Sequence, residues 1–211
     1  MNKNKQHWEN VYETKKSNEV SWTQDIPKTS LDFIQSFNVP KDAAIIDIGG
    51  GDSKLVDYLL ADGFINITVL DISENALEKA KIRLGKNAKK VKWIVSDITD
   101  FKPTTKYDIW HDRATFHFLT TATQIETYLQ TARKAINSYL TIGTFSQNGP
   151  FKCSGLEIKQ YSETTLQREL EEGFTKIKCI TEDHITPFNT AQNFLFCSFK
   201  KQDVKMHHQN K

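Results

Sequence analysis

A turn of three consecutive glycines next to acidic side chains is the feature of this sequence whose residue types and spacing suit chemistry best. The glycines are Gly49, Gly50 and Gly51, and Asp47 stands just before them. Glycines let a ligand approach the backbone closely, and the start of a following helix offers unpaired N–H groups. A dinucleotide site needs the pattern G-x-G-x-x-G, but Lys54 occupies the third position and the Asp47 carboxylate disfavours a pyrophosphate. The turn therefore favours a ligand with positive charge, and a tight strand-to-helix connection without a ligand is the plain alternative.

Two further aspartates follow later β-rich runs. Asp71 stands twenty residues beyond Gly51, where a carboxylate can accept hydrogen bonds from ribose hydroxyls. Asp97, followed by Ile98, ends the next β-rich run. Ligands bind outside the carboxyl ends of the strands in an open parallel sheet. We therefore expect all three aspartates at one ligand-binding edge.

Short β-rich runs alternate with helical patterns along most of the chain. Strands are expected over residues 43–48, 65–71, 92–98, 107–110 and 138–145, and helices over residues 30–37, 52–61, 75–84 and 124–136. This order predicts an α/β fold, a Rossmann-like doubly wound and mostly parallel sheet. Near the end, a helix over residues 165–171 precedes two strands over residues 174–180 and 193–199, which predict an antiparallel hairpin at the sheet edge.

Length and charge narrow the class of protein. A chain of 211 residues suits one domain, which we divide into an N-terminal lid or flank (1–40), the main body (41–201) and a polar tail (202–211). The formal charge of +2 gives no electrostatic case for nucleic-acid binding. No apolar run is long enough for a membrane span, and the N-terminus lacks the apolar core of a signal peptide. We therefore expect a cytoplasmic protein, a monomer or weak homodimer, without membrane or nucleic-acid partners.

The three cysteines are widely spaced. Cys179 and Cys197 lie in apolar, strand-like runs and are expected to be free buried thiols, and Cys153 is expected in a loop. So sparse a set argues against a disulfide framework and against a thiolate metal site, so no metal is expected.

The segments IIDIGGGDS (45–53), VLDIS (69–73) and SDI (96–98) together resemble the motifs of the class I S-adenosylmethionine-dependent methyltransferases. The resemblance extends over nearly the whole chain and implies a seven-stranded sheet whose last strand is antiparallel. It also implies S-adenosylmethionine as the cofactor. Ser53 is a departure, because many members have a third glycine there.

The resemblance assigns roles to individual residues on the cofactor side. Asp47 and the backbone of Gly49–Gly51 would face the methionine portion, and Asp71 would hold the ribose. The remaining cofactor contacts implied are Ile72 against the adenine and Asp97 and Ile98 at the adenine edge. Trp22 either covers the cofactor or packs within the N-terminal lid, and Asp112 is a candidate cofactor contact. For Asp112, capping of the next helix is the alternative.

The segment after the fourth predicted strand bears on the methyl acceptor. The pattern HWENVY…EVSW, with Asp112-Arg113 further on, resembles two branches of the family: thiopurine and thiol methyltransferases, and protein-lysine methyltransferases acting on elongation factor 1A. The second branch has an acidic-Lys-Gly-Thr segment where this chain has Arg113 and Ala114 after the aspartate. This difference favours a small-molecule acceptor with a thiol or another soft or anionic group, and a protein lysine is the alternative.

Three residues are candidates on the acceptor side. Arg113 either binds an anionic acceptor or pairs with Asp112. His117 either removes a proton from the acceptor or packs as a hydrogen-bonded histidine, and His184 is a candidate lining residue of the acceptor pocket. Other classes of protein stay open: a non-catalytic cofactor-binding protein, a nicotinamide oxidoreductase and an RNA methyltransferase. Balanced charge and the absence of an Asn-Pro-Pro-Tyr-type segment disfavour the last of these.

Overall fold

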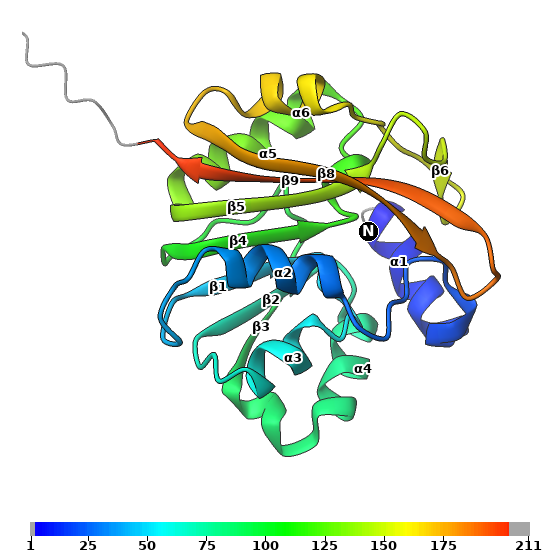
Figure 1. Cartoon of the computed structure of the whole chain (residues 1–211). Helices are drawn as coiled ribbons and strands as arrows, with labels where there is room; N and C mark the ends of the chain where they lie inside the picture. Colours follow the sequence, from blue (N-terminus) through cyan, green and yellow to red (C-terminus); the bar gives the residue numbers. More distant parts are fainter. Residues whose placement is uncertain (1–2, 203–211) are drawn as a thin grey trace, which may run out of the picture.

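A computed structural model describes residues 3–202 and contains a seven-stranded sheet in the order β3-β2-β1-β4-β5-β9-β8 (Figure 1). The first five strands pair in parallel, whereas β9 is antiparallel to β5 and β8 is antiparallel to β9. The strands of this sheet are β1 (Ile45–Ile48), β2 (Ile67–Asp71), β3 (Val91–Val95), β4 (Tyr107–Arg113), β5 (Ile136–Phe145), β8 (Phe174–Ile185) and β9 (Ala191–Lys201). A separate two-stranded sheet pairs β6 (Lys152–Cys153) with β7 (Leu156–Glu157). The predicted α/β class, with its mostly parallel sheet and antiparallel hairpin, is confirmed.

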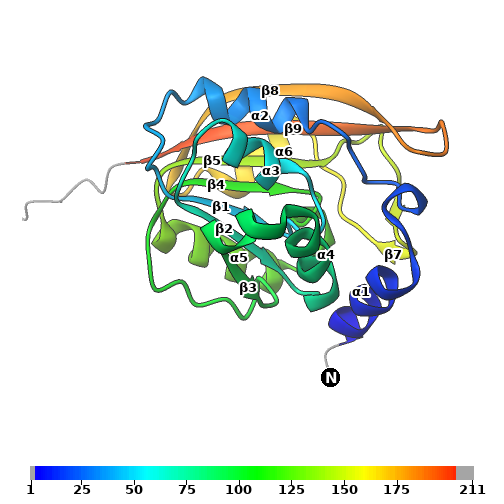
Figure 2. The same ribbon diagram turned by 90° about the horizontal axis from the view of Figure 1, so that it is seen from below.

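Helices cover both faces of the sheet (Figures 1 and 2). One face carries α2 (Lys28–Ser36), α3 (Leu55–Ala61) and α4 (Glu74–Leu84), and the other carries α5 (Ala122–Ala135) and α6 (Glu163–Leu170). Short 3-10 turns are η1 (Ser17–Glu19), η2 (Gly85–Lys90) and η3 (Phe116–Phe118). Helix α1 (Lys3–Thr14) belongs to neither layer and lies beyond the carboxyl ends of the central strands. No helix in the described part of the chain combines the length and hydrophobicity needed to cross a bilayer.

Successive strand side chains point to opposite faces, and this alternation divides the core into two parts. Ile46 and Ile48 of β1 and Trp110 of β4 pack toward α5 and α6. Ile45 of β1 and Ile109 of β4 pack toward α2 and α3. The same alternation decides which polar side chains at the carboxyl ends of the strands face the cavity.

The C-terminal hairpin is longer than predicted. Pairing of β8 with β9 continues to Ile185 and Ala191, through the polar residues Glu182, Asp183 and His184. These polar side chains suit β8, because an edge strand keeps part of its surface in solvent. The predicted polar tail lies outside the described residues, except for Gln202.

The prediction of free thiols at Cys179 and Cys197 is wrong. These residues are directly opposite each other in the β8–β9 pair and form a disulfide. Cys153 is a free, buried cysteine. The spacing of the cysteines did not reveal the bond, because the register of the two strands brings the sulfur atoms together.

We expect reduction of this disulfide to lower the free energy of unfolding by about 2–3 kcal/mol, because it frees a short loop in the unfolded chain. The two cysteines are 18 residues apart in sequence. Urea unfolding with and without a phosphine reductant measures the effect. Cys153→Ser is the matched control and should keep the reductant effect, whereas Cys197→Ser should abolish it. Equal midpoints for the reduced and oxidised wild-type protein would contradict the expectation.

Candidate active site

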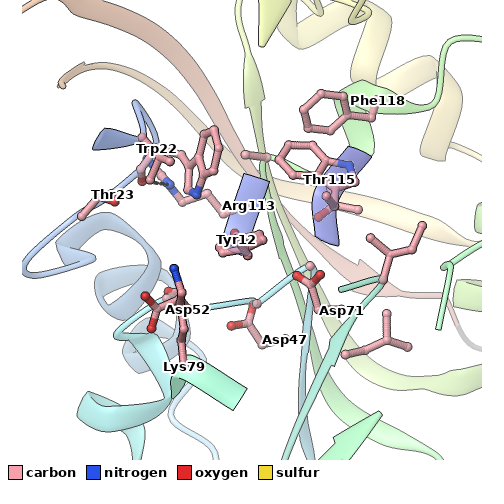
Figure 3. Close-up of a pocket in the computed structure, with 18 of the residues that line it drawn as sticks. Tyr12, Trp22, Thr23, Asp47, Asp52, Asp71, Lys79, Arg113, Thr115 and Phe118 are labelled. Carbon is pink, nitrogen blue, oxygen red and sulfur yellow. Dashed lines mark hydrogen bonds between the residues drawn. The ribbon is translucent and has the colours of Figure 1, made fainter. Parts of the chain in front are cut away.

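A cavity of about 570 Å³ lies at the carboxyl ends of β1, β2 and β4, which is a usual size for a small-molecule pocket. Figure 3 shows Asp47, Asp71 and Arg113 around it, with Tyr12 and Trp22 above the two aspartates in this view. The sequence-predicted residues that line the cavity are Trp22, Asp47, Gly49, Gly50, Asp71, Ile72, Asp97, Ile98 and Arg113. The structure therefore gathers most of the cofactor-side candidates around one space, together with Arg113 from the acceptor side.

The glycine turn is packed tightly from the cavity side. Gly49 has a φ of +64°, and a Cβ at this position would overlap Oγ1 of Thr115, whose hydroxyl donates to the carbonyl oxygen of Ile48 at 3.2 Å. Gly51 has a φ of +45°, and a Cβ there would lie 2.9 Å from the hydroxyl oxygen of Tyr12. Only glycine combines this backbone conformation with such close neighbours. Gly51 does not line the cavity itself; it forms part of the surface on which Tyr12 rests.

Asp71 ends β2 as a buried carboxylate. Its Oδ1 accepts a hydrogen bond from the backbone N–H of Ser73 at 2.8 Å. Burial, together with the negative charges of Asp47 and Glu9, raises the pKa of Asp71 to about 7 against the lowering effect of that hydrogen bond. A carboxylate that is costly to ionise gains most from donors supplied by a ligand, so Asp71 suits a partner with hydroxyl groups.

Asp97 does not end a strand as expected; it lies two residues beyond β3, at a turn on the flank of the cavity. Oδ1 of Asp97 accepts from the backbone N–H of Thr99 at 2.9 Å and from its hydroxyl at 2.8 Å. Ile98 lines the same flank, and Ile72 lines the wall that follows β2. This part of the cavity combines apolar surface with a carboxylate, which suits a flat heterocycle bearing an amino group.

Asp47 takes part in a buried hydrogen-bond chain that sequence reasoning missed. Its Oδ1 accepts from Nδ1–H of His111 at 2.7 Å, and Nε2 of His111 is 2.8 Å from the hydroxyl oxygen of Ser30. His111 is the direct neighbour of Asp47 in the β1–β4 register, and Ser30 comes from the first turn of α2. His111 stood in the segment already singled out after the fourth strand, but only the register shows that it faces Asp47.

Arg113 is buried against the cavity and does not pair with Asp112. Its Nη1 donates to the carbonyl oxygen of Trp22 at 3.0 Å, and the guanidinium lies 4.8 Å from the ring centre of Phe194. Its Nε and Nη2 have no hydrogen-bond partner among the described residues, and burial lowers the pKa of Arg113 to about 10. Two buried donors without partners suit an anionic ligand group.

Asp112 faces away from the cavity, which corrects its expected contact with the cofactor. Because side chains alternate along β4, Asp112 points toward α5, where its Oδ2 accepts from the hydroxyl of Tyr128 at 2.8 Å. Its Oδ1 accepts from the backbone N–H groups of Thr115 and Phe116 at 3.0 and 3.1 Å. Burial raises the pKa of Asp112 to about 6. Asp112 thus caps the turn at η3, as the alternative interpretation proposed.

The two candidate histidines also lie outside the cavity lining. His117 is fully buried, its Nδ1 accepts from the backbone N–H of Phe145 at 3.3 Å, and its ring stacks on Phe145. Burial and the nearby charge of Arg113 lower the pKa of His117 to about 3, so its imidazole is neutral. His184 donates from Nε2 to the carbonyl oxygen of Ser21 at 2.7 Å and thereby holds the N-terminal segment. Both side chains are engaged in packing, so the structure corrects their placement at an acceptor.

The N-terminal segment covers the cavity with aromatic rings. Trp8 packs against Trp22 and Phe118 with ring centres 5.6 and 5.2 Å apart, and Tyr12 lies 6.2 Å from Trp22. Helix α1 is anchored by Glu9, which accepts from the hydroxyl of Ser73 and from backbone N–H groups in the first turn of α4. A carboxylate is favourable at a helix N-terminus. Helix α1 was not predicted from the sequence. The spacing of Trp8 and Tyr12, one helical turn apart, is the signal that could have revealed a helix with one aromatic face.

Comparison with known proteins agrees with this fold. Residues 46–138 match a family model described as a methyltransferase domain. The match covers less than half of the chain; together with the seven-stranded topology and the glycine turn, it supports a class I S-adenosylmethionine-dependent methyltransferase.

Individual relatives are more distant. EEF1A lysine methyltransferase 2 of Mus musculus is 27% identical over 124 residues, which cover 53% of this chain and 50% of the relative. The enzyme of the same name from Danio rerio is 26% identical, over 53% of this chain and 52% of the relative. The chain thus spans about half the length of these curated relatives.

Solved structures resemble this one over most of the chain. A structure reported for the conversion of a disulfide bond into a thioacetal group in echinomycin biosynthesis has a TM-score of 0.74 and 16% identity, covering 94% of this chain and 93% of that one. The N-methyltransferase NodS of Bradyrhizobium japonicum, in complex with S-adenosylhomocysteine, has a TM-score of 0.65 and 16% identity, covering 85% and 90% of the two chains. At these identities the likeness shows the fold.

The cavity residues suit the cofactor of this family. The close packing at Gly49 and Gly51 requires a turn without side chains, and the buried carboxylate of Asp71 suits hydroxyl donors. The unpartnered Nε and Nη2 of Arg113 show that the same cavity can also take an anionic group. S-adenosylmethionine is an amino acid joined to a nucleoside, so its ribose hydroxyls suit Asp71. An anionic second ligand beside it would suit Arg113.

Proposed function

We propose that this protein transfers the methyl group of S-adenosylmethionine to an acceptor bound in the same cavity. The observation that carries the proposal is the meeting of the glycine turn, Asp71 and Asp97 around one cavity closed by aromatic rings. When bound, S-adenosylmethionine supplies a methyl group made electrophilic by a positively charged sulfur. The chain itself then has to bind and orient the two reactants and to exclude water.

The protein side chains divide this work between them. In this proposal Asp71 accepts hydrogen bonds from the ribose, and Asp97 with the apolar surfaces of Ile72 and Ile98 receives the adenine. Asp47 and the turn at Gly49 and Gly50 bind the methionine portion. Trp22, held in place by the hydrogen bond from Arg113 to its carbonyl, covers the cavity.

We propose a small acceptor with a thiol or another soft or anionic group. Arg113 supports this proposal, because its Nε and Nη2 are buried without partners next to the cavity. A buried guanidinium of this kind favours an anion that accepts two hydrogen bonds. The aromatic N-terminal segment restricts access to the cavity, which also favours a compact acceptor.

A protein lysine is the second candidate acceptor. The observation that favours it is the similarity to EEF1A lysine methyltransferase 2, whose name states a protein-lysine substrate. A lysine must lose a proton before methylation and must reach the cavity as part of a larger molecule. The two candidate acceptors can therefore be distinguished by whether a labelled methyl group appears on small molecules or on protein.

The test uses methyl-labelled S-adenosylmethionine, the pure protein and a lysate of its source cells, followed by acid precipitation. We expect label in new soluble or volatile species and none above background with Asp71→Ala, a variant designed to lose the cofactor. Protease-sensitive label in the precipitate would contradict the small acceptor and support the protein acceptor. Nuclease-sensitive label would contradict both. If the pure protein added no label above that of the lysate alone in any fraction, the methyltransferase proposal itself would fail.

A further inference from the structure

The buried chain Asp47–His111–Ser30 has no assigned role in the proposed function beyond the binding contact of Asp47. All three residues are buried, with exposed fractions of 4%, 2% and 1%, and all three line the cavity. They come from three separate elements, β1, β4 and α2. Both ring nitrogens of His111 are therefore held by partners on different elements, which fixes the orientation of the imidazole.

The chain can accommodate either protonation state of His111 without losing a hydrogen bond. A carboxylate only accepts, so Nδ1 of His111 carries a proton toward Asp47 in both states. In the neutral state Nε2 accepts from the Ser30 hydroxyl; in the cationic state Nε2–H donates to the same oxygen after the hydroxyl has rotated. The carboxylate of Asp47 stabilises the cation at 2.7 Å. This arrangement of carboxylate, imidazole and hydroxyl has the properties of a proton-accepting group.

The surroundings of His111 carry charges of both signs. Arg113 lies two residues further along the same face of β4, and Asp112 lies on the opposite face, where the charge of His111 acts on it. In α2, the charged residues Lys28 and Asp32 are exposed and pair with each other, so Ser30 is the polar group of α2 that reaches the imidazole. On β5, Thr141 is the register neighbour of His111 and carries no charge.

We propose that His111, held by Asp47 and reached through the Ser30 hydroxyl, takes the proton that a protic methyl acceptor loses. The inference rests on the proposed function and deepens it: the acceptor arrives as a thiol, an ammonium or another protonated nucleophile rather than as a carboxylate. His117 and His184, the histidines first considered for this step, lie outside the cavity lining. His111 is the histidine that lines the cavity within the described part of the chain.

The step balances in atoms and charge. The acceptor's proton passes to the oxygen of Ser30 as the Ser30 proton passes to Nε2 of His111, which becomes an imidazolium paired with Asp47. The electron pair freed on the acceptor forms the new bond to the methyl carbon. The pair of the broken carbon–sulfur bond stays on sulfur, which becomes neutral. One positive charge therefore leaves the sulfur and one appears on His111.

This exchange of charge can be measured without knowing the acceptor. Calorimetry in buffers of different ionisation enthalpy gives the number of protons taken up when a ligand binds. S-adenosylmethionine brings a positive sulfur that opposes a second positive charge on His111, whereas neutral S-adenosylhomocysteine does not. Between pH 6 and 8 we expect greater proton uptake with S-adenosylhomocysteine than with S-adenosylmethionine. The charge on sulfur also acts on Asp71, whose pKa of about 7 lies in this range, so the comparison is made in an Asp71→Asn background, which removes this contribution.

Further variants in this background assign the proton to its residue. His111→Asn keeps an N–H for Asp47 but cannot take a proton, and we expect it to abolish the difference between the two compounds. Ser30→Ala removes the hydrogen-bond partner of Nε2 and should reduce the difference in proton uptake between the two compounds. This second variant tests the inference even if His111→Asn does not fold. His117→Asn is the matched control, because it removes a buried histidine outside the cavity, and it should keep the full difference.

The outcomes separate the inference from the function on which it rests. Equal proton uptake with the two compounds in the Asp71→Asn background would overturn the role of His111 and leave cofactor binding intact. A difference that persists in His111→Asn would assign the proton to another group and would also overturn it. If neither compound bound to the wild-type protein, the proposed function would fail, and this inference with it.

Discussion

Replacing Asp71 with asparagine is expected to weaken binding of S-adenosylhomocysteine more than about tenfold and to raise the stability of the unliganded protein. The two effects have opposite signs because the same burial causes both. A hydrogen bond to a charged acceptor contributes about 1.5–3 kcal/mol, and 1.4 kcal/mol corresponds to a factor of ten in affinity. Asparagine keeps an oxygen for the N–H of Ser73 but has no charge to bury.

The stability gain depends on pH in a direction that follows from the pKa. Burial raises the pKa of Asp71 from its ordinary value of 3.8 to about 7, so the folded protein holds this proton more tightly than the unfolded chain. Stability is therefore lost as pH rises from about 4 to about 7, and the loss is complete above that range. We expect Asp71→Asn to lack this loss and to exceed the wild-type melting temperature at pH 8 by more than at pH 5.

Asp112→Asn is the matched control for Asp71→Asn. Asp112 is also a buried carboxylate with a raised pKa, but it lies outside the cavity. Its replacement should leave the dissociation constant for S-adenosylhomocysteine near the wild-type value. An unchanged dissociation constant in Asp71→Asn, or an equal loss in both variants, would remove Asp71 from the proposed ribose site.

Replacing Gly49 with alanine is expected to lower the free energy of unfolding by about 2–5 kcal/mol and to abolish cofactor binding. The left-handed conformation at Gly49 costs about 1–2 kcal/mol for a residue with a Cβ. The added methyl would also overlap Oγ1 of Thr115, and forcing an extra group into a packed site costs about 1–3 kcal/mol more. Urea unfolding measures the first effect and calorimetry with S-adenosylhomocysteine the second.

Two further variants separate backbone strain from the overlap. Gly63 also has a positive φ, but a Cβ there would meet no atom within 4 Å, so Gly63→Ala should show the backbone cost alone and should bind the cofactor normally. Adding Thr115→Ala to Gly49→Ala should recover part of the lost stability, because it removes the overlapping oxygen. Equal effects of Gly49→Ala and Gly63→Ala would mean that the close approach of Thr115 does not matter.

Features that depend on local sequence were predictable. A β-rich run followed by glycines and a helix defines its own turn, and aspartates at the ends of parallel strands meet at one edge whatever the details of packing. Asp47, Asp71 and Asp97 were therefore located at a shared cavity before the structure was known. The alternation of strands and helices likewise determined the fold class, because a parallel sheet needs helical crossovers.

The orientation of the residues after the fourth strand was not predictable. Strand β4 is buried on both faces, so it shows no polar and apolar alternation that would tell His111 from Asp112. The expected place of Asp112 beside the cavity is therefore taken by its neighbour: His111 reaches Asp47 on one face, and Asp112 caps a turn on the other.

The sequence by itself thus determined the α/β sheet and the strand-end acids, and the tertiary structure decided which distant side chains complete the site. Ser30 and His111 are 81 residues apart, and Cys179 meets Cys197 across a strand pair with a register shift. Such contacts depend on strand register and on the docking of α2, which the packing of the whole core sets. A local pattern specifies an element and its end, but only packing brings two elements into contact.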